Sequence, residues 1–371
     1  MLICYVSIET AKSAGERSAR ELRLVNNNWE LFMTGFHLRR RTFIAGMATA
    51  AGFGMAGFPR GAVAAQPVTI SEAIHLGFYI PVYTAIHKGL FEKHGLKPTL
   101  STAGGIAQPV PAIISKQAQF AVTGTGMSVN ATVEGAQMVN IAKIAGQISV
   151  WVVAKPGLKF ESFDDFKGKT IATLKYPSNT YTTPMYAMKM VAGFDPEAEG
   201  VKILQLPFGA QLQAVADGRA DIATVFEWDA SIGETQFGLE TVFSLGNALG
   251  PAAFATSFVT KQYLDENPET VQGYCNAIAE AQKLLHEDPK VFAEVSALEF
   301  PKLDPVVFET AKSRFFGDVP LVPRNPTISK AEWETLVEHE AGAETLRERL
   351  PYEQMVDNSF AQKAAAEFGL S

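Results

Sequence analysis

The sequence predicts an α/β fold with two lobes, each built on a mixed, mostly parallel sheet flanked by helices. After residue 65, short apolar runs alternate with segments of helical periodicity, as in chains of βαβ units. The stretch from residue 65 to residue 371 is long for one hydrophobic core and suits two. Asp217–Ala223 (DGRADIA) has a degenerate copy at Lys116–Ala121 (KQAQFA), a weak duplication that fits two similar lobes.

The first lobe is expected to open with a strand, an amphipathic helix closed by Gly95, and a second strand. Pro81 marks the turn between the first strand and the helix. Glycines follow the next two strands, where they permit tight turns and close approach of a ligand. The expected strands are 68–78, 97–102, 120–123, 139–145 and 150–154, and the expected helices are 82–94, 109–115 and 129–134.

A change of composition at Lys155-Pro156-Gly157 marks the expected start of the second lobe. We place the first lobe at residues 67–154 plus about 255–371, including C-terminal helices, and the second lobe at 155–254. The pattern predicts strands 171–174, 201–206, 222–225 and 254–260, and helices 181–191, 211–217, 267–286, 289–298, 305–315 and 330–343.

Residues 33–64 have the parts of an export signal. Arg39–Ile44 (RRRTFI) is a basic region typical of the twin-arginine route, and a Gly/Ala-rich apolar stretch and a small-x-small site ending at Ala64 follow. A retained membrane anchor is the alternative, but the apolar run is shorter than the roughly 20 residues that a spanning helix needs. We therefore expect cleavage near Ala64 and a periplasmic protein. Residues 1–32 are polar, and we interpret them as a non-native or disordered leader upstream of Met33.

Charge and cysteine content exclude several classes of function. Residues 65–371 carry 24 basic and 35 acidic side chains, a net charge of −11, which argues against nucleic acid and anionic lipid as partners. Cys275 follows a helical pattern and is expected to be a small buried residue. The six histidines show no metal-ligand spacing, and no hydrolase or phosphate-binding motif occurs. We therefore expect no cofactor, no metal and no catalytic residue.

The segment Gly89–Leu96 (GLFEKHGL), within Gly77–Thr102, resembles the first βαβ unit of periplasmic substrate-binding proteins of the nitrate, sulfonate and taurine type. Ser162–Thr170 (SFDDFKGKT) resembles the segment that opens the second lobe in that family, which extends to thiamine-pyrimidine-like members. The resemblance covers about Val68–Pro289. It implies the type II periplasmic-binding-protein fold and a monomeric receptor of an ABC transporter. Its partners would be a small-molecule ligand and an ABC permease in the inner membrane.

In a two-lobed binding protein the ligand lies where strand ends, glycine loops and helix N-termini of both lobes meet. Free backbone N–H groups at helix N-termini attract polar or anionic groups. Ordinary turns, helix capping and burial of tryptophan are alternative interpretations of the same residues. The predicted ligand-binding residues are Phe78, Tyr79, Pro81, Gly104, Gly105, Thr123, Thr125 and Trp151 in and near the first lobe, and Ser178, Asn179, Thr180, Glu227 and Trp228 in the second.

Three functions are compatible with these patterns. The first is an importer receptor that holds its ligand without altering it. The second is an enzyme like the pyrimidine-precursor synthase of the thiamine pathway, which has this fold but carries a cysteine-rich iron-binding motif that this sequence lacks. The third is a sensor that presents ligand to a membrane receptor. The ligand stays open among sulfonates or taurine, nitrate and heterocyclic precursors; aromatic residues favour an organic molecule, and an inward Glu227 would favour an amino-bearing one.

Overall fold

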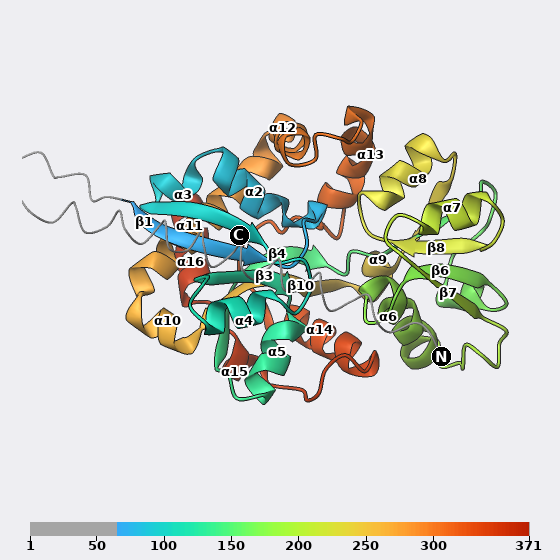
Figure 1. Cartoon of the computed structure of the whole chain (residues 1–371), viewed down its shortest axis with the longest axis horizontal. Coiled ribbons are helices and arrows are strands. Elements are labelled where there is room, and N and C mark those ends of the chain that lie inside the picture. Colours follow the sequence, from blue (N-terminus) through green and yellow to red (C-terminus); the bar gives the residue numbers. More distant parts are fainter. Residues whose placement is uncertain (1–64, 371) are drawn as a thin grey trace, which may run out of the picture. The chain divides into compact units, whose positions relative to one another are not determined.

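Two five-stranded sheets organise residues 65–370, the part of the chain that this computed structural model describes (Figure 1). The predicted leader, export signal and cleavage site lie outside the described residues. The strands of the first sheet are β1 (Gln66–Glu72), β2 (Leu96–Thr102), β3 (Phe120–Gly124), β4 (Met138–Gln147) and β10 (Pro251–Thr260); those of the second are β5 (Trp151–Ala154), β6 (Thr170–Leu174), β7 (Lys202–Leu206), β8 (Ile222–Val225) and β9 (Glu240–Ser244).

The two sheets have the same topology. Their strand orders are β2-β1-β3-β10-β4 and β7-β6-β8-β5-β9. In each sheet three successive strands, β1–β3 or β6–β8, pair in parallel. In each, one inserted strand, β10 or β5, runs antiparallel to its neighbours. The structure thus confirms the predicted two-lobed α/β fold with mixed sheets.

Helices cover both faces of the first sheet. The alternation of side chains along β3 shows this, because Phe120 and Val122 belong to one buried cluster and Ala121 to another. Figure 1 shows α2 and α3 on one side of this sheet and α4 and α5 on the other. The helices of this part of the chain are η1 (Gly77–Tyr79), α2 (Ile80–His87), α3 (Leu90–Lys93), α4 (Pro109–Ile114) and α5 (Gly126–Val133).

The second lobe has short helices around a small, fully buried strand, β8. Its entry is fixed by a capping box, in which Ser162 and Asp165 bind each other's backbone N–H groups. Pro184 lies inside α6, and the chain continues beyond that helix as a π-helical turn, η3. The helices are η2 (Phe163–Phe166), α6 (Asn179–Tyr186), η3 (Ala187–Val191), α7 (Gln211–Ala216), α8 (Asp229–Gln236) and α9 (Leu245–Leu249).

The C-terminal part of the chain is helical, as predicted. The longest helix, α11, packs against α2, and the last helix packs on α11. Among residues 65–370, no helix is both long and apolar enough to cross a bilayer. These helices are α10 (Lys261–Glu266), α11 (Pro268–Glu287), α12 (Pro289–Glu299), α13 (Pro305–Phe316), α14 (Lys330–Gly342), α15 (Tyr352–Met355) and α16 (Ser359–Phe368).

The strands β5 and β10 are exchanged between the lobes. β10 returns to the first sheet as expected, but β5 pairs with β8 and β9 in the second sheet, although the sequence placed residues 150–154 in the first lobe. The boundary therefore precedes Trp151, because β5 supplies the hydrogen bonds that β8 and β9 need. The two crossover segments touch, since the backbone N of Leu245 donates to the carbonyl oxygen of Val150 at 3.1 Å. A Cβ at Gly246 would lie 2.3 Å from the carbonyl oxygen of Ile148.

The first predicted strand and helix differ from the structure in their bounds. β1 ends at Glu72 rather than residue 78, and the chain turns through η1 before α2 begins. Pro81 lies in the first turn of α2, where its missing N–H leaves no helical bond unmade. Gly89, with φ 66°, separates α2 from α3, so the expected helix 82–94 is two helices. Sequence pattern also did not predict β9, whose side chains are half-buried.

The duplicated motif performs the same task in both lobes. Asp221 Oδ2 accepts a hydrogen bond from the backbone N of Thr170 at 2.7 Å, which fastens the entry of β8 to β6. In the first lobe, Gln119 Oε1 accepts from the backbone N of Thr69 at 2.7 Å and fastens β3 to β1. Three residues before these acceptors, Gly218 and Lys116 both have positive φ, 76° and 62°. The repeat is therefore a turn that aligns the third strand with the first.

This turn gives a stability test. A Cβ at Gly218 meets only ordinary contacts, so Gly218→Ala is expected to lose about 1 kcal/mol through the left-handed conformation alone. Lys116 already carries that strain, so Lys116→Ala should change stability by less than about 0.5 kcal/mol. Chemical denaturation of both variants measures the difference. Equal losses in both would contradict the equivalence of the two turns.

Candidate functional site

A cavity of about 180 Å³ lies between the carboxyl ends of strands from both lobes. We call it the aromatic cavity. The first lobe contributes η1, the end of β3 and part of β10, and the second contributes the ends of β6 and β8. Its lining residues are Ala73, Ile74, Leu76, Phe78, Tyr79, Ile106, Thr123, Gly124, Leu174, Lys175, Ser178, Asn179, Phe208, Phe226, Phe254 and Ala255.

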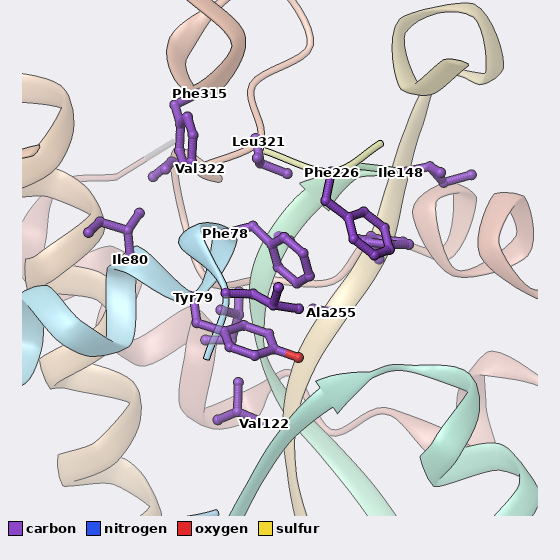
Figure 2. Close-up of a cluster of buried hydrophobic side chains, with 14 of the residues drawn as sticks. Phe78, Tyr79, Ile80, Val122, Ile148, Phe226, Ala255, Phe315, Leu321 and Val322 are labelled. Carbon is purple, nitrogen blue, oxygen red and sulfur yellow. The ribbon is translucent and has the colours of Figure 1, made fainter. Parts of the chain in front are cut away.

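Aromatic rings from both lobes meet in this cavity. The rings of Phe78 from the first lobe and Phe226 from the second lie side by side, with centroids 6.1 Å apart in an edge-to-face arrangement (Figure 2). Phe78 also contacts Tyr79 and Phe254 edge-to-face, at 4.8 and 5.6 Å. Such pairs prefer this geometry because the positive ring edge meets the negative face. The arrangement creates an apolar surface suited to an aromatic or aliphatic ligand body.

The polar groups of the cavity lie at its two sides. In the first lobe, the Thr123 hydroxyl donates to the carbonyl oxygen of Ile106 at 2.8 Å. Burial, with Glu72 nearby, raises the pKa of Tyr79 above its usual range, so its phenol stays protonated. In the second lobe, Ser178 caps α6 and Asn179 is the first residue of that helix. The N–H groups of Thr180, Tyr181 and Thr182 already donate to Ser178, which leaves the N–H of Asn179 in this turn to donate to a ligand.

A second cavity of about 610 Å³ adjoins the first, and we call it the Glu340 cavity. Ile106, Gly124 and Asn179 line both cavities, so the two are adjacent at these residues. The remaining wall comes from the loop after β2, from α5, from the 176–177 turn and from the end of α14. Its lining residues are Gly105, Ile106, Ala107, Gln108, Gly124, Met127, Asn130, Tyr176, Pro177, Asn179, Glu340, Glu344, Thr345, Leu346 and Arg347.

Two adjacent side chains of α14 reach the two lobes. Glu340 lies at the N-terminus of α5, where a Cβ on Gly126 would be 1.6 Å from Glu340 Oε2. His339 Nε2 lies 3.1 Å from the hydroxyl of Thr183 on α6. Burial lowers the pKa of His339 to about 4, and it raises the pKa of Glu340 to about 7 against the opposing effect of the Gly126 N–H. The helix α14 therefore contacts both lobes beside the cavities.

The structure brings part of the predicted site together. Phe78, Tyr79, Thr123, Ser178 and Asn179 line the aromatic cavity, and Gly105 lines the Glu340 cavity. The other predicted residues of these loops line neither cavity. Pro81 is buried in α2, Gly104 has φ 79° in the loop after β2, the hydroxyl of Thr125 donates to the carbonyl oxygen of Ala253, and Thr180 Oγ1 accepts from the backbone N of Leu174.

Glu227 and Trp228 point away from the aromatic cavity, contrary to the sequence prediction. Glu227 is buried and forms an ion pair with Arg314 of α13. Trp228 stacks on Phe315 with ring centroids 5.3 Å apart, and a Cβ on Gly77 would be 2.7 Å from its indole. Their neighbour Phe226 reaches the cavity instead. Trp151 lines a separate cavity near the crossovers, with Gln147 and Phe243.

Sequence reasoning missed several residues of the two cavities. Phe226 precedes the predicted residues Glu227 and Trp228 and immediately follows β8. This position at a strand end is the signal that would have identified it as a cavity residue. Phe208 is 63% exposed although it is large and apolar, but no sequence pattern distinguishes it. Glu340 comes from a helix far along the chain. The one sequence signal for it is Gly126, because a residue without a side chain at that position lets another group approach α5 closely.

A family model described as NMT1/THI5 like matches residues 78–291, more than half of the chain. The chain belongs to the NMT1/THI5-like family. The matched residues include both faces of the aromatic cavity, from Phe78 to Phe254. A relative from Bacillus subtilis (strain 168), named "Putative binding protein YtlA", is 26% identical over 303 residues, covering 81% of this chain and 90% of the relative.

Solved structures of similar fold agree with this family. The periplasmic aliphatic sulphonate binding protein SsuA of Escherichia coli has a TM-score of 0.61 and 17% identity, over 75% of this chain and 91% of SsuA. The periplasmic nitrate-binding protein NrtA of Synechocystis PCC 6803 has a TM-score of 0.58 and 13% identity, over 81% of this chain and 89% of NrtA. At these identities the likeness establishes that this member of the NMT1/THI5-like family has the periplasmic-binding-protein fold.

The environment of Cys275 does not favour nucleophilic chemistry. This side chain is fully buried, and its thiol donates to the carbonyl oxygen of Ile141 at 3.5 Å. Burial raises the pKa of the thiol above its usual range, which disfavours the reactive thiolate. Across residues 65–370, no three His, Cys, Asp or Glu side chains gather as a metal site.

The ion pair of Glu227 and Arg314 can be tested by a double-mutant cycle. Arg314→Met is expected to cost about 3–5 kcal/mol, because it leaves a buried carboxylate uncompensated. Adding Glu227→Gln should recover about 1–3 kcal/mol of this loss, measured by chemical denaturation. The control is Lys312→Met, whose partner Glu309 is 57% exposed, and it should stay within about 0.5 kcal/mol of the parent. Additive losses would contradict the pairing.

The adjacent pair on α14 gives opposing pH dependences. His339 titrates at about 4 when folded and 6.5 when unfolded, so its contribution to stability is complete above pH 6.5 and is lost as pH falls toward 4. Glu340 titrates at about 7 when folded and 4.5 when unfolded, so its contribution is complete below pH 4.5 and is lost as pH rises through 7. Between pH 4.5 and 6.5 the two slopes oppose each other.

Each variant should therefore expose the slope of the other residue. Relative to the parent, His339→Asn should lose stability as pH rises from 4.5 to 6.5, by at most about 1.4 kcal/mol per pH unit. Glu340→Gln should gain relative stability over the same range. Denaturation curves at half-unit pH steps measure both trends, and parallel profiles for all three proteins would refute them.

Proposed function

We propose that the protein is the solute-binding receptor of an ABC importer, which holds a small organic ligand in the aromatic cavity and delivers it to a membrane permease. The observation that carries this proposal is that both lobes contribute rings and polar groups to one cavity. A ligand bound there touches both lobes at once, and its binding energy can favour the closed arrangement. The receptor acts as a monomer in the periplasm and leaves the ligand unaltered.

The relatives support a binding role outside the cytoplasm. The names of SsuA and NrtA describe periplasmic proteins that bind aliphatic sulphonates and nitrate, and the Bacillus subtilis relative is named as a binding protein. We infer the same role and location here, with the twin-arginine signal at residues 33–64 as the means of export.

The chemistry of the cavity favours an organic ligand over an inorganic anion. Its volume of about 180 Å³ compares with the roughly 150 Å³ of an engineered apolar cavity that takes benzene. Phe78, Phe226 and Phe254 belong to an apolar wall, whereas Lys175 is the one cationic side chain in the lining and is exposed. A bare anion needs several donors in place of its hydration shell, and this lining supplies few.

Apolar side chains at the cavity explain why a ligand would stabilise closure. Ile74 of the first lobe is 37% exposed, and Phe208 of the second is 63% exposed. Both line the aromatic cavity, and covering them with a ligand removes apolar surface from water. The two adjoining crossover segments provide the place where the lobes can bend.

A thermal-shift screen tests this function. The purified protein is heated with alkanesulfonates, taurine, nitrate, and thiamine or riboflavin precursors. A true ligand at about 100 times its Kd adds about 2.7 kcal/mol of stability and raises Tm. We expect at least one organic compound to do so. A response to nitrate alone would overturn the organic assignment, and chemical conversion of the bound compound would overturn the receptor assignment.

Matched phenylalanine variants locate the binding site. Phe226→Leu removes an edge-to-face contact inside the aromatic cavity and is expected to weaken binding of the identified ligand about tenfold. Phe243→Leu changes a ring that packs on Phe160 in the second lobe, away from this cavity, and should leave the Kd within about threefold. Titration calorimetry measures both. Equal effects would place the ligand elsewhere.

A further inference from the structure

Beside the aromatic cavity lies a buried acidic side chain that the proposed function has not used. Glu340 is 6% exposed and lines the cavity named after it. Its Oε2 has no hydrogen-bond partner among the described residues. Buried carboxyl groups normally have a cation or several donors around them, because an unpaired one loses its hydration without compensation. The backbone N–H of Gly126 favours the charged form of Glu340, and no side-chain donor among residues 65–370 accompanies it at Oε2.

The surrounding charges do not satisfy this carboxyl group. Arg347 lines the same cavity, but its Nη1 pairs with Glu134 Oε1 at 2.7 Å and its side chain is 64% exposed. Glu344 adds a second acidic side chain to the lining. The backbone N–H of Gly126 at the start of α5 approaches the carboxyl group and favours its charged form. No side-chain donor in residues 65–370 reaches Oε2.

The two cavities are adjacent, which places this group next to the proposed ligand site. Ile106, Gly124 and Asn179 line both, so the walls that separate the aromatic rings from the Glu340 cavity are formed by these three residues. The helix that carries Glu340 also holds the second lobe through His339 and Thr183, which fixes the carboxyl group relative to both lobes. An anionic group in this cavity would face two acidic side chains, whereas a cationic group would meet an unpaired acceptor.

We propose, building on the receptor function above, that Glu340 binds a nitrogen of the ligand that carries a positive charge or donates N–H groups. The receptor then selects amine- or amidine-bearing organic molecules whose small apolar or aromatic body lies in the aromatic cavity. The carboxylate accepts a hydrogen bond from that nitrogen through Oε1, because Oε2 faces Gly126 and is closed off from the cavity.

Glu340 could instead serve only as a cap for α5, and a matched pair of probes separates the two roles. Benzylamine and benzyl alcohol share a ring of the size of the aromatic cavity and differ in the charged nitrogen. Their affinities are measured by titration calorimetry on the full-length protein at low salt and pH 8, where Glu340 is mostly ionised and benzylamine is protonated. The same titrations are run on Glu340→Gln and on Glu348→Gln.

We expect the parent to bind benzylamine at least about tenfold more tightly than benzyl alcohol. In Glu340→Gln this preference should fall below about threefold while the affinity for benzyl alcohol is unchanged. Glu348→Gln removes an exposed charge that lines neither cavity and should keep the preference. Glu340→Asp, which keeps the charge and shortens the side chain, should retain part of it and serves if the glutamine variant does not fold.

Several results would overturn the inference. Equal affinity of the parent for the two probes would do so, as would a preference that survives in Glu340→Gln. Failure of benzylamine to bind while compounds of the thermal-shift screen do bind would also overturn it and would leave the receptor function intact. The absence of a response to every compound in that screen is a separate result, which counts against the receptor function itself.

Discussion

The buried contact between the turn after β8 and the helices α12 and α13 determines how the rest of the site is arranged. Glu227 pairs with Arg314, and Trp228 fills the space between Gly77, Phe315 and neighbouring rings. Because these two residues are held on the side of α13, the preceding residue, Phe226, is directed into the aromatic cavity. A buried ion pair costs desolvation, and here it fixes the direction of a strand end.

A second set of contacts, made by α14, holds the other side of the second lobe. His339 reaches α6 and Glu340 reaches α5, so a helix near the C-terminus touches both lobes. Gly77 and Gly126 make these contacts possible, because a Cβ at either position would overlap Trp228 or Glu340. The helices α12 and α13 make one set of contacts and α14 makes the other, and the cavities lie between these two sets. The crossover strands β5 and β10 form a third connection between the lobes.

Much of the fold could be read from the sequence, and the reasons are local. The alternation of apolar runs and amphipathic segments, the Asn267-Pro268 helix start and the duplicated turn each depend on residues close together in the chain. The assignment of β5 to the second sheet could not be read in this way, because strand exchange depends on pairing with β8 and β9. The site was harder for the same reason. Phe78 and Ser178 were predicted because each follows a strand in the chain. The partner that turns Glu227 away, Arg314, lies far along the chain.

The places of the tryptophans have a practical consequence. Of the described residues, Trp151 lies at the crossovers, Trp228 under α13 and Trp333 in the core cluster below β10, and none of these three lines the aromatic cavity. A ligand held between Phe78 and Phe226 would therefore not quench an indole by direct contact. Any change of intrinsic fluorescence when a compound is added would instead report a rearrangement of the polypeptide around Trp151 or Trp228, which makes these residues built-in reporters of lobe movement rather than of occupancy.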